Sequence, residues 1–269
     1  MTSTLEKSLI QARNDLRAAA PLVHCITNPI AINDCANAIL AVGAKPIMAE
    51  HPEEVEEITR LSGALGINIG NITDARRVSI LKSAAAAKAC GIPVSFDAVG
   101  VTCSALRRAL AHELLQTACP DILKGNEAEI RAIAGAHFES RGIDALHTDT
   151  AGTAEIAARL AGTLRCVVLV TGQIDIITDG ARTVLCENGT PRLALVTGTG
   201  CMVHALSAAC SAVCPPFEAA VLAASTLGIC GEQADRPGIG LGSFHISLID
   251  WLSALSDDTY SEHLRLRVL

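Results

Sequence analysis

The first half of the chain alternates short apolar runs with longer segments of helical periodicity. Apolar positions three and four residues apart predict helices over 32–40, 52–61, 74–88 and 104–118. Shorter apolar runs predict strands over 45–48, 64–69, 92–97 and 121–123. In the helix that opens at Pro52, the inner face is expected to carry Val55, Ile58 and Leu61. Strands that alternate with helices of this length indicate parallel βαβ units.

The pattern changes after residue 165. An apolar run over 166–170 ends in Thr171-Gly172, and two further runs, 174–178 and 183–186, flank Asp179-Gly180. Such a dipeptide between short apolar runs predicts a hairpin. Asn188-Gly189 marks another turn, after which 193–196 is expected to continue an antiparallel meander.

Alanine-rich helices are then expected from Cys201 toward Cys230, buried either in the core or in an interface between subunits. No internal repeat, linker or charge block interrupts the chain, so we expect one domain over residues 1–269. The segments 136–150 and 233–243 lack an apolar period and are expected to be surface loops.

The composition argues against several classes of protein. The 269 residues are 50% hydrophobic, 2% aromatic and 18% charged, with a formal net charge of −7. An acidic chain without a cluster of Lys and Arg is unsuited to nucleic-acid binding. Charged residues interrupt the N-terminus, and prolines interrupt the least charged stretch, 201–217, which argues against a signal peptide or a membrane span. We expect a cytoplasmic protein with no membrane contact.

Eleven cysteines are scattered along the chain, without a C-x-x-C pair. A structural zinc site calls for close pairs, and a disulfide framework is typical of small secreted chains. Most of these cysteines lie among Ala, Val and Ile, where a free thiol packs as a small hydrophobic group. We therefore expect reduced cysteines, and a redox or metal protein is disfavoured.

The sequence lacks the common phosphate-binding and metalloprotease motifs: G-x-x-x-x-G-K-[ST], G-x-G-x-x-G after a strand, and H-E-x-x-H. A different anion site is indicated by the segment 196–201, Val-Thr-Gly-Thr-Gly-Cys, before a long apolar helix. Gly198 and Gly200 allow close backbone approach, and the helix start offers unpaired N–H groups. Cys201 at that position is expected to have a lowered pKa. The alternative is a tight turn with a small packed cysteine.

A second candidate lies where a strand meets a helix at residues 124–129, Lys-Gly-Asn-Glu-Ala-Glu. Asn126 and Glu129 fit an N-cap with a capping box, which explains both without any function. The functional interpretation is that Lys124 contacts a phosphate and that Glu129 acts on a magnesium ion through water. Asp97 ends a buried strand, at the edge where open α/β sheets bind ligands, and is either a magnesium partner or a cap.

Polar residues surround one more strand-to-helix junction, namely His24, Asn28 and Asn33. They can hold a small substrate or satisfy a turn. Met48, at the end of a short strand, is a ligand contact or a core residue.

In order, several segments resemble one known family, and the match runs from about residue 20 to 250. The segments are 21–28 (PLVHCITN), 46–49 (PIMA), 63–70 (GALGINIG), 124–126 (KGN), 171–172 (TG), 197–201 (TGTGC) and 242–244 (GSF). They look like those of hydroxyethylthiazole kinases, which phosphorylate 4-methyl-5-(2-hydroxyethyl)thiazole with ATP and magnesium in thiamine salvage. The set is specific, although no single member is.

The resemblance implies a ribokinase-like three-layer α/β fold, with a largely parallel central sheet, an antiparallel meander and helices on both faces. It further implies a homotrimer with active sites at subunit interfaces. The residue roles that it implies are as follows: Met48, Gly198 and Asn28 at the substrate, Lys124 and Thr171 at ATP, Gly200 at the phosphate, Cys201 as the catalytic residue, and Asp97 and Glu129 near Mg²⁺.

The chain departs from the family pattern after the third strand. The family usually has Asp-Pro-Val-Gly-(small)-Gly-Ala-Thr, whereas residues 97–104 are Asp-Ala-Val-Gly-Val-Thr-Cys-Ser. Lys124 stands where arginine is commoner, which replaces a bidentate fork by a point charge, and Asn71 stands where threonine is usual. Two alternatives therefore stay open: a ribokinase-like kinase for another small alcohol, and a sensor that binds ligand or nucleotide without turnover.

Overall fold

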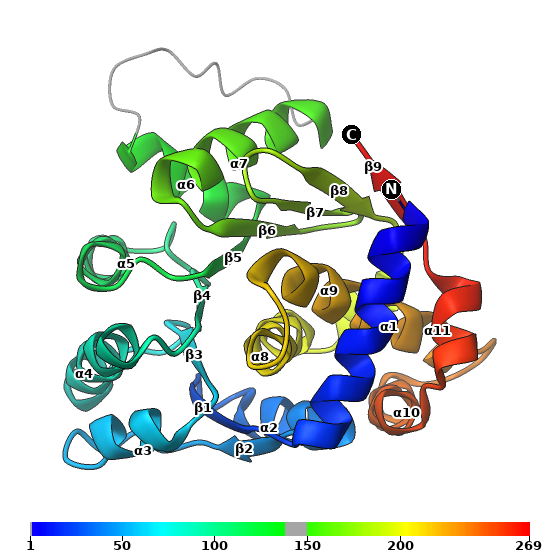
Figure 1. Ribbon diagram of the computed structural model, residues 1–269, viewed down its shortest axis with the longest axis horizontal. Helices are drawn as coiled ribbons and strands as arrows, with labels where there is room; N and C mark the ends of the chain where they lie inside the picture. The colour runs from blue at the N-terminus through cyan, green and yellow to red at the C-terminus, as the bar shows by residue number, and fades with distance from the viewer. Residues whose placement is uncertain (1, 138–149) are drawn as a thin grey trace.

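A nine-stranded sheet crosses the part of the chain that the computed structural model describes, residues 2–137 and 150–269 (Figure 1). The strands are β1 (Leu22–Ile26), β2 (Lys45–Ile47), β3 (Ala64–Asn68), β4 (Val94–Asp97), β5 (Ile122–Asn126), β6 (Val167–Thr171), β7 (Asp175–Thr178), β8 (Thr183–Cys186) and β9 (Leu266–Val268). Their order is β2-β1-β3-β4-β5-β6-β7-β8-β9. Neighbouring strands from β2 to β6 are parallel, as the alternating pattern predicts.

Helices cover both faces of the sheet, which makes three layers (Figure 1). They are α1 (Thr2–Ala19), α2 (Ile32–Ala41), α3 (Val55–Leu61), α4 (Asp74–Cys90), α5 (Ala105–Thr117), α6 (Glu127–His137), α7 (Thr150–Leu164), α8 (Thr199–Ser211), α9 (Pro216–Ala234), α10 (Leu241–Ala254) and α11 (Asp257–His263). One face carries α3 to α7, and the other carries α1, α2 and α8 to α11. Two apolar clusters, one under each helix layer, form the core.

Helix α8 explains how the site is placed. Its residues 201–211 are all buried, between β3 and β4 on one side and α9 on the other. The alanine-rich segments thus pack in the core of this chain, which decides between the two places expected for them. Helix α8 runs along β3 in the opposite direction, with Cys201 beside Asn68 at the carboxyl end of the strand and Ala212 beside Gly63 before its amino end, so its first turn meets the carboxyl ends of the parallel strands.

The antiparallel part agrees only partly with the prediction. The hairpin around Asp179-Gly180 is confirmed, since β7 pairs antiparallel with β8 and Gly180 has a φ of 90°. The expected strand over 193–196 is wrong, because Pro191–Leu195 forms a 3₁₀ helix in which Thr190 accepts from the Arg192 N–H. β8 is instead completed by β9 from the C-terminus, a pairing between segments that lie far apart in sequence.

The charged helix after Pro52 is shorter than expected and presents a different face. It begins at Val55, and its buried residues are Val55 and Thr59. Leu61 is 67% exposed, so its expected place on the inner face is wrong. Thr59 is held inside by His24, whose Nδ1 lies 2.9 Å from the Thr59 hydroxyl. The helix therefore buries the polar Thr59 through its contact with His24, and the apolar Leu61 stays exposed.

Other predictions concern loops, membranes and cysteines. Most of the expected loop 136–150 lies outside the described residues, while the expected loop 233–243 is reduced to 235–240 between α9 and α10. Within 2–137 and 150–269, no helix has both the length and the hydropathy that a membrane span requires. All eleven cysteines are free thiols.

Candidate active site

Polar side chains gather at the carboxyl ends of the parallel strands. Asn68 ends β3 and Asp97 ends β4, while Lys124 lies in β5; the strand register pairs Asn68 with Asp97 and Asp97 with Lys124. Asn28 follows β1, the strand on the other side of β3. The chain adds β2 on one side of β1 and then β3 on the other side, so the order of strand addition switches here while the strands stay parallel. Open α/β sheets bind ligands at such a switch point.

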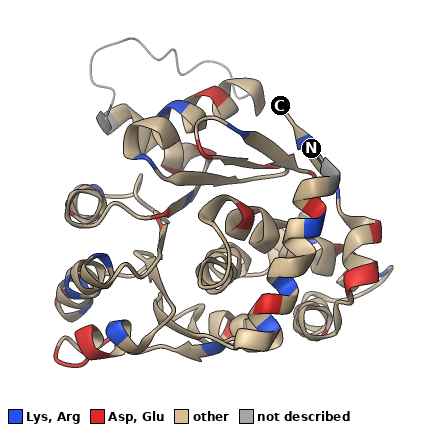
Figure 2. Ribbon diagram, viewed as in Figure 1, with Lys and Arg blue, Asp and Glu red and all other residues tan. Residues whose placement is uncertain are grey.

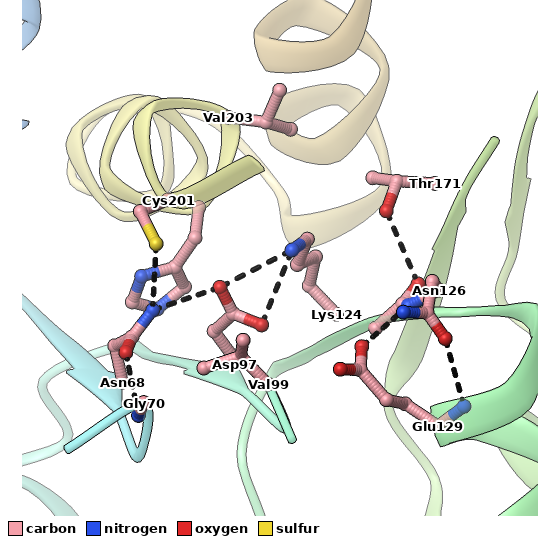
Figure 3. Close-up of polar contacts among 12 residues, drawn as sticks. Asn68, Gly70, Asp97, Val99, Lys124, Asn126, Glu129, Thr171, Cys201 and Val203 are labelled. Carbon is pink, nitrogen blue, oxygen red and sulfur yellow. Dashed lines mark hydrogen bonds and ion pairs between the residues drawn. The ribbon is translucent and has the colours of Figure 1, made fainter. Parts of the chain in front are cut away.

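A buried ion pair lies at the centre of this group (Figure 3). The Lys124 Nζ lies 3.2 Å from both carboxylate oxygens of Asp97, which is fully buried. Asn68 Nδ2 donates to Asp97 Oδ2 over 2.9 Å. Burial lowers the pKa of Lys124, but the charges of Asp97 and Glu129 and the hydrogen bond to Asp97 outweigh it, so the pKa is raised overall. The site therefore contains a permanent ammonium group.

The start of α8 faces that ammonium group. The helix is entered through Gly198, whose φ of 94° belongs to the left-handed region and which, as a glycine, has no side chain to cap the first turn. A Cβ on Gly200 would lie 3.3 Å from Lys124 Nζ, so the absence of a side chain lets the lysine approach the backbone. The first N–H groups of a helix have no partner within it. Together with the lysine they form a site for an anion.

Cys201 completes this group, since it lies in the first turn of α8. Asn28 Nδ2 and Asn68 Nδ2 donate to its Sγ over 3.2 and 3.3 Å. Burial, followed by the charge of Asp97, raises the pKa of the thiol, and the lowering effects of Lys124 and the two amides do not offset this. The expected lowering of the Cys201 pKa is therefore wrong: the helix start is present, but desolvation of the thiolate is the larger effect.

The capping box at the start of α6 is confirmed. Glu129 N donates to Asn126 Oδ1 over 3.0 Å, and Asn126 N donates to Glu129 Oε2 over 2.8 Å. The second carboxylate oxygen, Oε1, accepts from Gly100 N over 2.7 Å. Glu129 thus ties the loop 97–104 to α6. This loop keeps a compact turn despite its unusual sequence, since Val101 N donates to the carbonyl of Ala98.

Two other predicted residues share this edge of the sheet. Thr171 ends β6 beside Asn126, and its hydroxyl donates to the carbonyl of Gly125 over 3.4 Å. Met48 follows β2 and is partly buried against the core. Among the described contacts, neither residue joins the hydrogen-bonded group around Asp97.

Sequence reasoning missed Asn68 and Arg107. Asn68 contacts both Asp97 and Cys201, and a polar residue at the end of a buried apolar strand was the signal that could have found it. Arg107, on α5, donates to the carbonyls of Ile69 and Gly70 and so holds the loop after β3. Nothing in the spacing of α5 distinguishes it from the neighbouring Arg108.

Charges on the rest of the surface are dispersed (Figure 2). Figure 2 shows acidic and basic residues scattered over the helices on both faces of the sheet.

Comparison with known proteins agrees with this geometry. The model of the hydroxyethylthiazole kinase family matches residues 14–258. A hydroxyethylthiazole kinase 2 of Clostridium botulinum is 43% identical over 263 residues, which cover 96% of this chain and 99% of the relative.

Solved structures give the same result. A hydroxyethylthiazole kinase structure from Pyrococcus horikoshii has a TM-score of 0.91 at 37% identity and covers 98% of this chain and 99% of its own. A ribokinase-like superfamily protein from Enterococcus faecalis, at 11% identity and a TM-score of 0.63, covers 90% of this chain and 89% of its own and confirms the fold class. From its sequence and its fold together, this chain belongs to the hydroxyethylthiazole kinase family.

Proposed function

We propose that this chain transfers the γ-phosphoryl group of ATP to the hydroxyl of 4-methyl-5-(2-hydroxyethyl)thiazole, in the thiamine pathway. The observation that carries the proposal is the meeting of Lys124 with the uncapped start of α8, directly beside Cys201. Phosphoryl transfer depends mainly on positioning and on neutralising phosphate charge. A fixed ammonium group and a row of free backbone N–H groups supply both.

The residues divide into two sides. On the phosphate side, Lys124 and the N–H of Gly200 would bind the transferred group, and Thr171 would contact ATP. On the substrate side, Met48, Gly198 and Asn28 would hold the thiazole. The support for this division is that Asn28 and Gly198 approach Cys201 from the side of β1 and α2, whereas Thr171 lies beyond β5.

Cys201 is proposed as the catalytic residue next to the substrate hydroxyl. Because its pKa is raised, the group present at neutral pH is the thiol and not the thiolate. A thiol held by two amide donors orients the alcohol better than it removes a proton. We therefore assign Cys201 to positioning the hydroxyl for in-line attack.

Magnesium fits this site as a partner of the nucleotide. Among the described residues, no three His, Cys, Asp or Glu side chains are grouped as a metal site, and both oxygens of Glu129 accept backbone N–H groups. Mg²⁺ commonly keeps several waters and is held by one or two carboxylates plus substrate phosphates. Asp97 and Glu129 would hold it through its water ligands, and its charge would offset that of the phosphates.

We further propose that the protein is a homotrimer with active sites at subunit interfaces, and that it is cytoplasmic. The trimer is supported by family membership, and the location by eleven free thiols, which are typical of a reducing compartment. Sedimentation velocity on the purified protein tests the first: a species of three chains is expected, and a monomer that turns over the thiazole would contradict it.

The deciding experiment measures ATP-dependent product formation with the thiazole, ribose and a hydroxymethyl-pyrimidine, with and without magnesium. Phosphorylation of the thiazole alone, only with magnesium, supports the proposal. Product from another alcohol alone would favour the related kinase, and binding without product would favour the sensor. In the last case the loop 97–104 would be the segment to exchange for the common family sequence.

A further inference from the structure

Two cysteines meet at the edge of the sheet opposite the candidate active site. Cys119 lies between α5 and β5, and Cys166 immediately precedes β6. Because β5 and β6 are parallel neighbours, with Ile122 opposite Val167, the amino ends of both strands bring the two residues together. The Sγ of Cys119 reaches the carbonyl of Leu164, two residues before Cys166, so the two thiols are neighbours.

The two thiols differ in exposure and in proton affinity. Cys119 is exposed, and in its protonated form its Sγ donates to the carbonyl of Leu164 over 2.9 Å. The hydrogen bond from Cys166, helped by Lys88, lowers the pKa of Cys119 to about 7, against burial and the charge of Asp121. The same hydrogen bond, together with burial, raises the pKa of Cys166. An accessible thiol with a lowered pKa therefore neighbours a buried thiol with a raised pKa.

We propose that Cys119 and Cys166 are a reversible redox pair, in which a peroxide oxidises Cys119 and Cys166 resolves the product as a disulfide. The Cys119 thiolate attacks one peroxide oxygen, the O–O bond breaks, and hydroxide leaves and is protonated to water. The Cys166 sulfur then attacks the sulfenic sulfur, which forms the S–S bond, breaks the S–O bond and releases a second water with the Cys166 proton. Two thiols lose two electrons, and one hydrogen peroxide becomes two waters.

The position of the pair in the fold determines how its oxidation affects kinase turnover. Asp97, Asn126 and Thr171 lie at the carboxyl ends of β4, β5 and β6, whereas the cysteines lie at the amino ends of β5 and β6. The disulfide would link two segments that are already neighbours in the sheet, so turnover should be retained. A small thiol reductant would reverse the reaction by exchange. Oxidation of the pair thus consumes one peroxide and leaves the candidate active site intact.

The experiment treats the full-length protein with one equivalent of hydrogen peroxide at pH 7, followed by alkylation and peptide mass spectrometry. The variants are Cys119→Ser, Cys166→Ser and, as a matched control, Cys90→Ser, since Cys90 is also exposed. Circular dichroism and kinase turnover verify that each variant is folded.

In the wild-type protein, Cys119 and Cys166 should be lost together as one disulfide, at least about fivefold faster than Cys90. Cys166→Ser should accumulate a sulfenic acid at residue 119 that dimedone traps, and Cys119→Ser should abolish the fast phase, while Cys90→Ser changes neither. Oxidation that begins at Cys90 or Cys103, or a mixed disulfide of Cys119 with any cysteine other than Cys166, would overturn the proposal.

Discussion

The buried ion pair of Lys124 and Asp97 permits a test that separates stability from function. Lys124→Met keeps the length of the side chain but removes the charge, and it leaves a carboxylate that is fully buried. Breaking a buried pair by removing one partner costs about 3–5 kcal/mol of unfolding free energy. Since Asn68 continues to donate to Asp97 over 2.9 Å, we expect a loss near the lower end, about 3 kcal/mol.

The double variant Lys124→Met with Asp97→Asn removes both charges. Replacing a buried ion pair by neutral groups of similar volume is often neutral or stabilising. The carbonyl of the introduced amide can still accept from Asn68, so the double variant should regain at least about 2 kcal/mol over Lys124→Met. Its kinase activity should not return, because the ammonium group at the start of α8 is still missing.

Urea denaturation followed by circular dichroism measures the free energy of unfolding, and a coupled assay of ADP release with the thiazole measures kinase activity. Arg77→Ala serves as the control, since Arg77 forms an exposed ion pair with Glu113 over 2.7 Å. Exposed pairs contribute little, so this variant should have the wild-type urea midpoint and the wild-type turnover.

Two results would refute the reasoning. If Lys124→Met lost no more stability than Arg77→Ala, the pair would not be desolvated as the structure shows. If the double variant regained turnover along with stability, then the role of Lys124 would be structural and it would not bind phosphate.

Three further changes, one of them with a control, probe the start of α8 and Asp175, the first residue of β7. Cys201→Ala should lower kcat at least about tenfold and leave ATP affinity within about twofold, by removing a group next to the alcohol; unchanged kcat in steady-state assays would exclude that role. Gly198→Ala, at a φ of 94°, should cost about 1–2 kcal/mol and reduce kcat/KM, whereas Gly91→Ala, at a φ of 67° with open space around it, should be strained without loss of activity. Burial raises the pKa of Asp175 to about 6, against the hydrogen bond from Gly172 N. Its folded form holds the proton more tightly than the unfolded form, so its penalty is absent below the unfolded pKa and complete above about pH 6. Asp175→Asn should therefore raise the free energy of unfolding measured in urea at pH 7.5 by about 1 kcal/mol, and should not raise it at pH 4; an equal gain at both pH values would contradict this.

The parallel half of the fold could be predicted because its signals are local. Helix periodicity, the left-handed Gly91 at the end of α4 and the capping box of Asn126 and Glu129 each depend on residues within one turn of one another. The pairing of β8 with β9 could not be predicted, since it joins residue 185 to residue 267. Leu61 was misplaced because a helix of seven residues presents too few positions to define its buried face.

The candidate site, too, was predictable only where its signals are local in the sequence. Local sequence was enough to tell that Asp97 ends a buried strand, that Lys124 lies where a strand meets a helix, and that Gly198 and Cys201 lie at a helix start, whereas the family resemblance joined them in one site. The charge states and partners of these residues came from the tertiary structure alone. Burial raised the pKa of Cys201 where helix position alone predicted the opposite, and Asn68 came between Asp97 and Cys201. Desolvation and contact depend on what the rest of the chain packs around a group, and no local pattern contains that information.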